Sequence, residues 1–413
     1  MKKALRWATL LCILLGMALF FLLPEPAETP KEEPAASKPV APAPTAPVSD
    51  TAWNTFHGDA TMRGAADISL PAALEVRWRL KTRAPVRQTP VGGSGAGIFV
   101  VTMRGEVIAA NWKDGTERWA RELFTGETMN NQPVRRRFEA PPAFFDGMFF
   151  AGDNDGVFMA FDGQTGADLW QAKLEGPVRG GPNYLGPDDT HPNGRVFVID
   201  SADGAVLCLD AKTGAQQWRA PLGERSDATP AVSPEALVYG SCASALHVVN
   251  PADGKRIHDI KLDADSQIAG GCALGDGFAY SGSRSGKIVK ADIRAGVFAW
   301  TNEDSEAEVF TTPAVAGDTV VAGSEDGFVI AVDRATGKQR WRVDSGGYPL
   351  SPVIAGDKVL LAADGELIML GLADGAKLWS LKVADDITSP MLLGDLVIVG
   401  TEDGTVTAFG AAK

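Results

Sequence analysis

The chain has 413 residues, and its 39 basic and 52 acidic side chains give a formal net charge of −13. This acidic balance argues against nucleic acid as a partner, because phosphate binding depends on clustered Lys and Arg in a basic field. An apolar content of 45% excludes a disordered chain, and four cysteines are too few for a disulfide-stapled scaffold. The length allows two or three domains, or one large repetitive domain.

The N-terminus carries a predicted membrane segment. Three basic residues among the first six precede a sixteen-residue, largely apolar run that ends at Leu23. A cleaved signal peptide and an uncleaved anchor both fit this pattern. We favour residues 1–23 as a single-pass anchor, because no small-x-small cleavage site follows and the residue before Cys12 is not small, as a lipoprotein signal requires. The remainder is then exported to the periplasmic side of the cytoplasmic membrane, or secreted if the segment is cleaved.

Residues 24–50 form a predicted disordered tether. They hold eight prolines and six alanines, with two valines as the only large apolar side chains. Such a segment cannot bury a core. Its prolines favour an extended spacer that reaches roughly 80 Å at about 3.1 Å per residue. We expect it to hold a globular domain, residues 51–413, away from a membrane.

A repeat of about 41 residues dominates this domain. Its fullest copy runs Ala331-Val-Asp333-Arg-Ala-Thr336-Gly337-Lys-Gln-Arg-Trp341. Asp and Thr suit a tight turn between two strands, and Gly supplies the positive φ that the turn needs. The last position of the phrase recurs at steps of 38 to 51 residues, as Trp78, Trp119, Trp170, Trp218, His258, Trp300, Trp341 and Trp379.

Two further phrases complete each unit. An Asp-Gly turn such as Asp326-Gly327 recurs in most units, and a Ser/Thr-Pro pair such as Thr312-Pro313 opens the unit. Proline has no N–H to donate, so it belongs on an edge strand, and an innermost strand beside a central channel is such an edge. Four short strands per unit without helical periodicity predict an all-β fold, a β-propeller of four-stranded blades.

Counting the units predicts eight blades. Seven complete units end at the positions from Trp119 to Trp379, and residues 384–409 then supply three strands without a fourth. The missing strand is expected at residues 74–82, which carry Trp78. The ring is therefore closed by N- and C-terminal strand complementation, which removes an open sheet edge. We expect the eight repeated Trp and His residues to be structural, each wedging one blade against the glycine turn of its neighbour.

The phrase Ala-x-Asp-x-x-Thr-Gly-x-x-x-Trp resembles the tryptophan-docking motif of the pyrroloquinoline-quinone-type (PQQ-like) propeller repeat family, over residues 51–413. Residues 53–59, with the sequence WNTFHGD, also look like the segment that precedes the first blade in that family. The resemblance implies one of two classes. One holds the quinoprotein alcohol and glucose dehydrogenases. The other holds non-enzymatic members such as the periplasmic outer-membrane protein assembly factor BamB, also an eight-bladed ring.

Membership of the dehydrogenase class implies PQQ and calcium in the channel, above an adjacent cysteine pair. Here Cys208, Cys242 and Cys272 are 34 and 30 residues apart, and the chain has no Cys-x-x-Cys-His for haem attachment. We therefore predict no enzyme activity, no catalytic, cofactor or metal site, and no cofactor. A PQQ-binding redox protein, with calcium, is the alternative. The three cysteines are either buried thiols or one pair plus a free residue.

One acidic loop raises the question of a metal site. It reads Asp188-Asp189-Thr190-His191 and lies between two strands of the third blade. Asp and His at this spacing are able to bind a metal ion. A solvated loop accounts for the same residues, and we favour that interpretation.

An insertion before the second blade carries the predicted binding site. From Trp119 to the next channel proline, Pro142, the chain takes 23 residues, against 11 to 13 in the other units. Guanidinium groups match carboxylates bidentately, so an arc of arginines here predicts docking of an acidic peptide or anion. A solvated cluster that balances local carboxylates such as Glu139 accounts for the same residues and is the interpretation we favour, with the docking site as its alternative. The candidate residues, from three adjacent blades, are Arg87, Arg135, Arg136, Arg137 and Arg179.

Together these features predict a non-catalytic, exported protein-binding scaffold of the cell envelope. Its partner is expected to be an envelope protein or peptide, and the oligomeric state stays open. The proline-rich tether and the absent lipoprotein signal differ from the usual pattern of the assembly factor, and they favour the outer face of the cytoplasmic membrane. A polysaccharide-binding ring is a third alternative, for which the sequence offers no aromatic stripe beyond Trp112.

Overall fold

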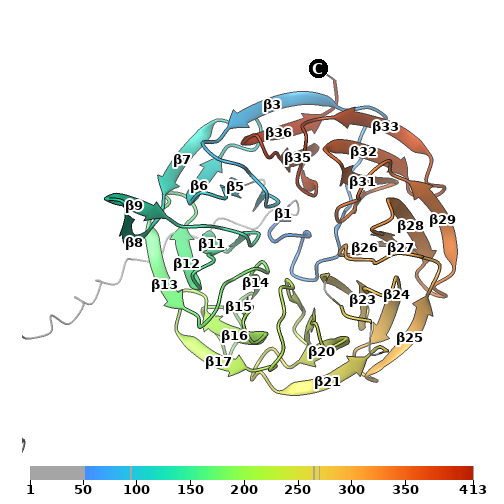
Figure 1. Ribbon diagram of the computed structural model, residues 1–413, viewed down its shortest axis with the longest axis horizontal. Coiled ribbons are helices and arrows are strands. Elements are labelled where there is room, and N and C mark those ends of the chain that lie inside the picture. Colours follow the sequence, from blue (N-terminus) through green and yellow to red (C-terminus); the bar gives the residue numbers. More distant parts are fainter. Residues whose placement is uncertain (1–51, 94, 264–265, 269, 413) are drawn as a thin grey trace, which may run out of the picture. The chain divides into compact units, whose positions relative to one another are not determined.

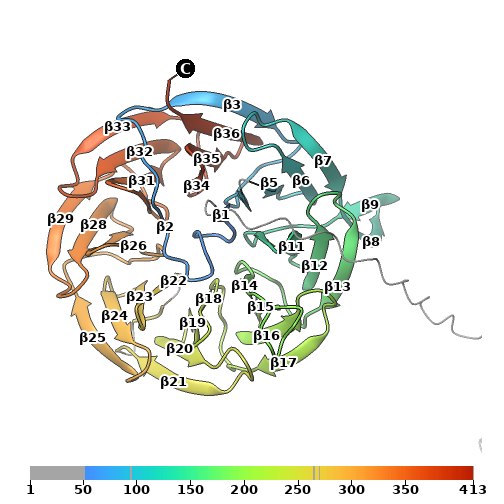
Figure 2. The same ribbon diagram turned by 180° about the vertical axis from the view of Figure 1, so that it is seen from behind.

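A computed structural model describes residues 52–412 except 94, 264–265 and 269, so the predicted anchor, residues 1–23, and tether, residues 24–50, lie outside it. Residues 52–412 form a ring of eight sheets around a central axis (Figures 1 and 2). The predicted all-β, eight-bladed propeller is confirmed. In the described part of the chain, no helix is long and apolar enough to cross a membrane.

The first four blades are antiparallel sheets of consecutive strands, ordered from the innermost strand to the outermost. Blade 1 is β4 (Val91–Gly93), β5 (Gly97–Val101), β6 (Glu106–Ala110) and β7 (Glu117–Glu122). Blade 2 is β10 (Ala143–Phe145), β11 (Met148–Gly152), β12 (Val157–Asp162) and β13 (Asp168–Lys173). Blade 3 is β14 (Asn183–Leu185), β15 (Arg195–Asp200), β16 (Ala205–Asp210) and β17 (Gln216–Ala220). Blade 4 is β18 (Ala231–Val232), β19 (Leu237–Gly240), β20 (Ala245–Val249) and β21 (Arg256–Lys261).

The last four blades continue the ring in the same order. Blade 5 is β22 (Cys272–Gly275), β23 (Phe278–Gly282), β24 (Ile288–Asp292) and β25 (Val297–Asn302). Blade 6 is β26 (Ala314–Ala316), β27 (Thr319–Gly323), β28 (Phe328–Asp333) and β29 (Gln339–Asp344). Blade 7 is β30 (Val353–Ala355), β31 (Lys358–Ala363), β32 (Glu366–Gly371) and β33 (Lys377–Lys382). Blade 8 is β34 (Met391–Leu393), β35 (Leu396–Gly400), β36 (Thr405–Gly410) and β3 (Glu75–Lys81).

The burial of side chains in each strand depends on how that strand packs against the two adjacent blades. The second and third strands read as continuous apolar runs, and β5 and β35 are buried at every position. Both faces of such a strand pack against adjacent blades, so alternation of polar and apolar residues is lost. The outermost strands are half exposed, as in β7 and β29, because one side of each meets solvent at the rim.

The ring closes where the two ends of the chain meet. Strand β3 pairs antiparallel with β36, with Val76 opposite Phe409 and Lys81 opposite Thr405. Figure 1 shows β3, in blue, on the outer side of β36, in red. The predicted strand complementation is confirmed, and the outermost strand of blade 8 is supplied from the start of the domain.

The joints between blades place each repeated aromatic ring against a glycine of the next blade. A Cβ atom added to that glycine would lie 2.6–2.8 Å from the nearest ring atom of the preceding blade. At Gly375 such an atom would also meet Val343, at 2.7 Å. These glycines all have φ near +72°, a conformation that favours glycine. The seven pairs are Trp78 with Gly115, Trp119 with Gly166, Trp170 with Gly214, Trp218 with Gly254, His258 with Gly296, Trp300 with Gly337, and Trp341 with Gly375.

The eighth ring, Trp379, has a different environment. Blade 8 takes its outer strand from the other end of the chain, so it has no turn of the repeated phrase for Trp379 to meet. The Trp379 indole instead meets Phe409 edge-on at a centroid distance of 6.3 Å. The expectation that all eight rings meet a glycine turn therefore holds at seven joints.

Residues 52–66, which we call the strap, line the inside of the ring. Its strands are β1 (Ala52–Trp53), which pairs with β4, and β2 (Ala65–Ala66), which pairs parallel with β30. Between them the strap carbonyls accept hydrogen bonds from backbone N–H groups of the innermost strands of blades 2, 4, 5 and 6, and Gly64 O accepts one from blade 7. The donors are Phe144, Val232, Leu274, Val315 and Ile354, at distances of 2.7–2.8 Å.

The strap therefore satisfies inner sheet edges that would otherwise present unpaired N–H groups. His57 fixes its course: the ring nitrogens lie 2.9 Å from Met62 O and 2.8 Å from Pro352 O. A neutral imidazole donates to only one of these carbonyls. Burial nevertheless dominates and lowers the pKa of His57.

Candidate functional site

The two faces of the ring differ in the segments they carry. Consecutive strands are antiparallel, so the connections between blades share one face with the turn between the second and third strand of each blade. We call this the connection face. Ala52 pairs with Gly93, at the far end of β4, so the strap begins on the opposite face.

The insertion before blade 2 folds into a hairpin on the connection face. Strands β8 (Phe124–Met129) and β9 (Gln132–Arg135) pair with each other alone and project beyond the rim in Figure 1. Asn130 and Asn131 occupy the turn with φ of 51° and 61°, as a two-residue hairpin turn requires. The sequence marked the insertion by its length but did not predict the hairpin.

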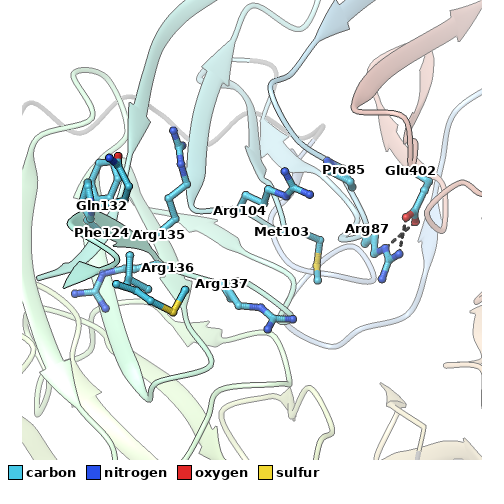
Figure 3. Close-up of a pocket in the computed structure, with 13 residues that line it drawn as sticks. Pro85, Arg87, Met103, Arg104, Phe124, Gln132, Arg135, Arg136, Arg137 and Glu402 are labelled. Atoms are coloured by element: carbon cyan, nitrogen blue, oxygen red, sulfur yellow. Dashed lines mark hydrogen bonds and ion pairs between the residues drawn. The ribbon is translucent and has the colours of Figure 1, made fainter. Parts of the chain in front are cut away.

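A groove of about 740 Å³ lies between this hairpin and the start of blade 1. Figure 3 shows its side chains. Apolar surface comes from Met103, Phe124 and Met129, among others, and Glu402 of blade 8 stands at one end. Of the predicted arginines four line the groove, and Arg179 does not; a fifth lining arginine was missed, so the set is Arg87, Arg104, Arg135, Arg136 and Arg137.

Arg136 is a structural member of this set. Its guanidinium pairs with Asp153, whose side chain is fully buried, and 11% of the Arg136 side chain is exposed. Asp153 also accepts hydrogen bonds from the backbone N–H of Asp155 and of Val157, at 3.0 and 2.7 Å. Removing one partner of a buried ion pair leaves the other charge uncompensated. Arg136 therefore holds the β9–β10 connection against the β11–β12 turn.

Arg87 is also engaged within the protein. Its Nε and one terminal nitrogen donate to the two carboxylate oxygens of Glu402 at 2.7 and 2.5 Å, a bidentate pair drawn in Figure 3. This hydrogen bonding lowers the pKa of Glu402. The pair links the chain before blade 1 to blade 8, across the closing joint of the ring.

The remaining arginines are more open. Arg135 lies 2.9 Å from Glu122 and 5.4 Å from the centroid of the Phe124 ring. Hydrogen bonding from Arg135 lowers the pKa of Glu122. Arg137 and Arg179 share Glu139 at 3.5 and 3.7 Å, and Arg137 is 66% exposed.

Arg104 stands apart from its neighbours. It is exposed in the β5–β6 turn, where most other blades carry the Asp of the Asp-Gly turn. Within the described residues, no ion pair or hydrogen bond of its side chain is found. The sequence signal that would have found it is the replacement of a repeated acidic residue by a basic one.

Ion pairs within this region engage most of its arginines. Local carboxylates pair with six arginines, namely the groove arginines other than Arg104 together with Arg83 and Arg179. The carboxylates are five in number, namely Glu106, Glu122, Glu139, Asp153 and Glu402. Arg104 adds a further positive charge, on a chain whose net charge is −13. Part of the cluster is thus internally balanced, and part faces solvent.

A smaller cavity of about 220 Å³ adjoins the groove at the mouth of the ring, and Arg87 lines both. Phe56 of the strap forms part of its lining, with Phe310 and Tyr348 from the connections around blades 6 and 7. The hydroxyl-bearing residues of the Ser/Thr-Pro phrases supply the polar part, including Thr89, Thr311, Ser351, Thr388 and Ser389. We call this cavity the funnel.

Blade 4 holds a Ser-His-Asp network that the sequence did not reveal. His247 Nε2 lies 2.7 Å from Ser241 Oγ, and Nδ1 lies 2.6 Å from Asp259. A nucleophile, a base and an orienting carboxylate have this arrangement in hydrolases. Ser241 and His247 are each only 2% exposed, however, and burial lowers the pKa of His247. The network joins the β19–β20 turn to β21, and its buried Ser and His side chains are not accessible to a substrate.

The other candidate groups are structural or isolated. Asp188 lies 3.0 Å from His191 Nδ1 and 2.7 Å from Arg195, so its carboxylate is already paired. No cluster of three or more His, Cys, Asp or Glu residues that could hold a metal ion occurs in the described part of the chain. Cys208, Cys242 and Cys272 are all free thiols, and Cys242 alone of them is exposed.

Comparison with known proteins agrees with this architecture. The family model described as outer membrane protein assembly factor BamB matches residues 124–270 and 247–413. A relative with that name from Yersinia pestis is 23% identical over 296 residues, which cover 66% of this chain and 68% of the relative.

Two solved structures share the fold. BamB from Moraxella catarrhalis has a TM-score of 0.65 at 19% identity and covers 82% of this chain and 98% of its own. A europium-containing methanol dehydrogenase has a TM-score of 0.73 at 14% identity and covers 88% and 98%. Identities this low show the fold alone, so the family rests on the match to residues 124–413. On that match, the chain belongs to the family described as outer membrane protein assembly factor BamB.

Proposed function

We propose that this protein is a non-catalytic scaffold of the cell envelope that binds a partner protein on its connection face. Membership of the BamB family supports a role of this kind, since its relatives are named as factors in outer-membrane protein assembly. Export is proposed from residues 1–23, which would anchor the ring to the periplasmic side of the cytoplasmic membrane. The tether, residues 24–50, would give it reach.

The groove is the observation that carries this proposal. It is large enough for a segment of a partner, within the range of about 300–1,000 Å³ that binding pockets span. It combines exposed apolar and positively charged side chains on an acidic protein. The hairpin that forms one wall comes from an insertion that no other blade carries among the described residues. A wall of this kind adds surface without contributing to the closure of the ring.

The PQQ-dependent redox protein remains the second candidate, because the dehydrogenases share the fold. The residues present do not favour it. The strap lies along the inner strands, and the three described cysteines form no adjacent pair to stack beneath a quinone. Purified protein with PQQ and calcium, assayed with dye acceptors and alcohols or sugars, would test it. Turnover in that assay would overturn the scaffold proposal.

Site-specific crosslinking in the native membrane tests the scaffold directly. A photoreactive amino acid replaces Gln132 on the hairpin, and a second variant carries it in place of Leu378, exposed on the rim strand β33. We expect crosslinks from position 132 to one envelope protein, identified by mass spectrometry, and none to that protein from position 378. Equal capture from both positions, or no protein adduct at position 132, would contradict a docking role for this face.

A further inference from the structure

We infer that the groove binds an acidic, extended segment of the partner, and that Arg104 recognises a carboxylate of that segment. The inference rests on the proposed scaffold function and adds the chemistry of the bound segment. The five groove arginines differ from one another: some are fully paired with carboxylates of the protein, and others are not. Arg87 and Arg136 are engaged with Glu402 and Asp153, so their guanidinium forks are already occupied.

Among the groove arginines, Arg104 is the one whose guanidinium N–H groups make no hydrogen bond or ion pair with the described residues. It is exposed, and its side chain has no ion pair among residues 52–412 that the structure describes. Figure 3 shows it between the hairpin and the start of blade 1. A guanidinium carries five N–H donors in a planar fork that matches a carboxylate. Arg135 and Arg137, each paired on one side and partly exposed, lie in the same groove.

The apolar lining indicates that the ligand is a peptide and not a small anion. Met129 is 67% exposed and Phe124 37% exposed, and Met103 lines the same groove. Exposed methionine side chains adapt to varied apolar partners. An acidic segment with interspersed apolar residues satisfies both the arginines and this surface. A phosphate or a free dicarboxylate would leave the apolar part uncovered.

The shape of the site fits an extended chain. The groove, of about 740 Å³, and the funnel, of about 220 Å³, share Arg87 in their linings. A segment would therefore run from the hairpin at the rim toward the mouth of the ring. Most hydroxyl groups in the funnel lining are already bonded within the protein, as at Thr311 and Thr388, so the aromatic part of the lining offers the contact surface for a peptide. The strap begins on the opposite face and reaches this path at Phe56, which lines the funnel.

Binding of a labelled peptide to the full-length protein in detergent tests whether the groove recognises an acidic segment. The probe is a fluorescein-labelled peptide of alternating Glu and Leu, and its control carries Gln in place of each Glu. Fluorescence anisotropy should show binding of the acidic peptide and much weaker binding of the Gln peptide. Arg104→Glu should weaken binding at least about tenfold, as expected for loss of one charge-assisted pair. Raising the salt concentration should also weaken it.

Arg294→Glu is the matched control. Arg294 is exposed in the β24–β25 turn on the opposite face, and the substitution changes the net charge by the same amount. It should leave peptide affinity within twofold, and both variants should keep the wild-type melting temperature. Equal losses in the two variants, or equal binding of the Glu and Gln peptides, would overturn the inference. So would displacement of the peptide by vesicles of anionic phospholipid, which would point to a lipid surface.

The two proposals fail separately. Crosslinking from position 132 to an envelope protein, without binding of the acidic peptide, would leave the scaffold standing and remove the acidic segment. Peptide binding that depends on Arg104, without any crosslinked partner in the membrane, would support the groove as a site and remove the scaffold.

Discussion

The indole of Trp119 lies against Gly166 of the next blade, so closely that a Cβ on Gly166 would come within 2.8 Å of the ring. The indole N–H donates to Gly163 O of the same turn at 3.1 Å. One residue of blade 1 is thus fixed to the backbone of blade 2 by both packing and a hydrogen bond. The hydrogen-bonded joint recurs at Trp78, Trp170, His258, Trp300 and Trp341. Trp218 packs on Gly254 in the same way, but its indole N–H has no hydrogen-bond partner among the described residues.

Gly166→Ala should destabilise the protein by about 2–4 kcal/mol. The residue has φ of +72°, which disfavours any side chain, and the added methyl group would press on the Trp119 ring. Urea denaturation followed by tryptophan fluorescence measures the effect.

Gly147→Ala separates the two causes. Gly147 has φ of +76°, but a Cβ there meets nothing within 4 Å, so backbone strain alone remains. We expect a loss of about 1–2 kcal/mol. A loss at Gly147 as large as that at Gly166 would show that contact with the indole adds nothing.

Trp78→Ala should cost about 3–5 kcal/mol, the range for truncating a buried aromatic side chain. The Trp78 indole lies on Gly115, donates to Trp112 O at 2.9 Å and belongs to the strand that closes the ring. Trp379→Ala should cost less, since no glycine turn lies under that indole. The two midpoints of thermal unfolding test this order. The reverse order would mean that the closing joint adds little to stability.

Removal of the His57 side chain should loosen the strap. His57→Ala deletes the ring that contacts Met62 O and Pro352 O, and the inner-strand amides would then exchange faster with solvent. Hydrogen exchange read by NMR at Val232, Leu274 and Val315 reports on this, because these amides donate to the strap. The amide of Val100, inside β5 and away from the strap, is the control. Unchanged exchange at all of them would show that the strap is held without the imidazole.

Stability should fall as the pH drops below about 6.5, the pKa of histidine in an unfolded chain. Burial lowers the folded-state pKa of His57 and of His247, so the unfolded chain binds protons first on acidification. Each histidine contributes a slope of up to about 1.4 kcal/mol per pH unit, until the pH passes its folded pKa. In His247→Gln the slope between pH 6.5 and 5.5 should be shallower, as measured by urea midpoints. An unchanged slope would contradict a neutral, buried His247.

Thiol labelling at pH 8 should modify Cys242 in the native protein, while Cys208 and Cys272 resist. Burial raises the pKa of each of these two thiols to about 12 and also blocks the reagent. Mass spectrometry of the Cys12→Ser variant, with and without urea, should show one maleimide before unfolding and three after. A native product with two or three adducts would show that blade 3 or blade 5 opens readily.

Much of the fold could be predicted from the sequence because the joints are local and repeated. Gly337, four residues before Trp341, marks a turn and a strand within one unit, and the same spacing recurs in seven units. Strand complementation was also predictable, because Trp78 had no unit of its own and the last unit had no tryptophan. These signals depend on neighbours in the chain, which a single sequence displays.

The binding site depended on the tertiary structure. The sequence placed Arg135, Arg136 and Arg137 side by side, but folding sends Arg136 to a buried carboxylate and leaves Arg137 exposed. Arg104 is distant in sequence from the insertion, and only the fold brings it to the same groove. The strap, likewise, satisfies inner-strand amides as far along the chain as Ile354. These contacts join segments that are far apart in the chain, so the tertiary structure was needed to identify them, although a basic residue at position 104 of a usually acidic turn was a local signal.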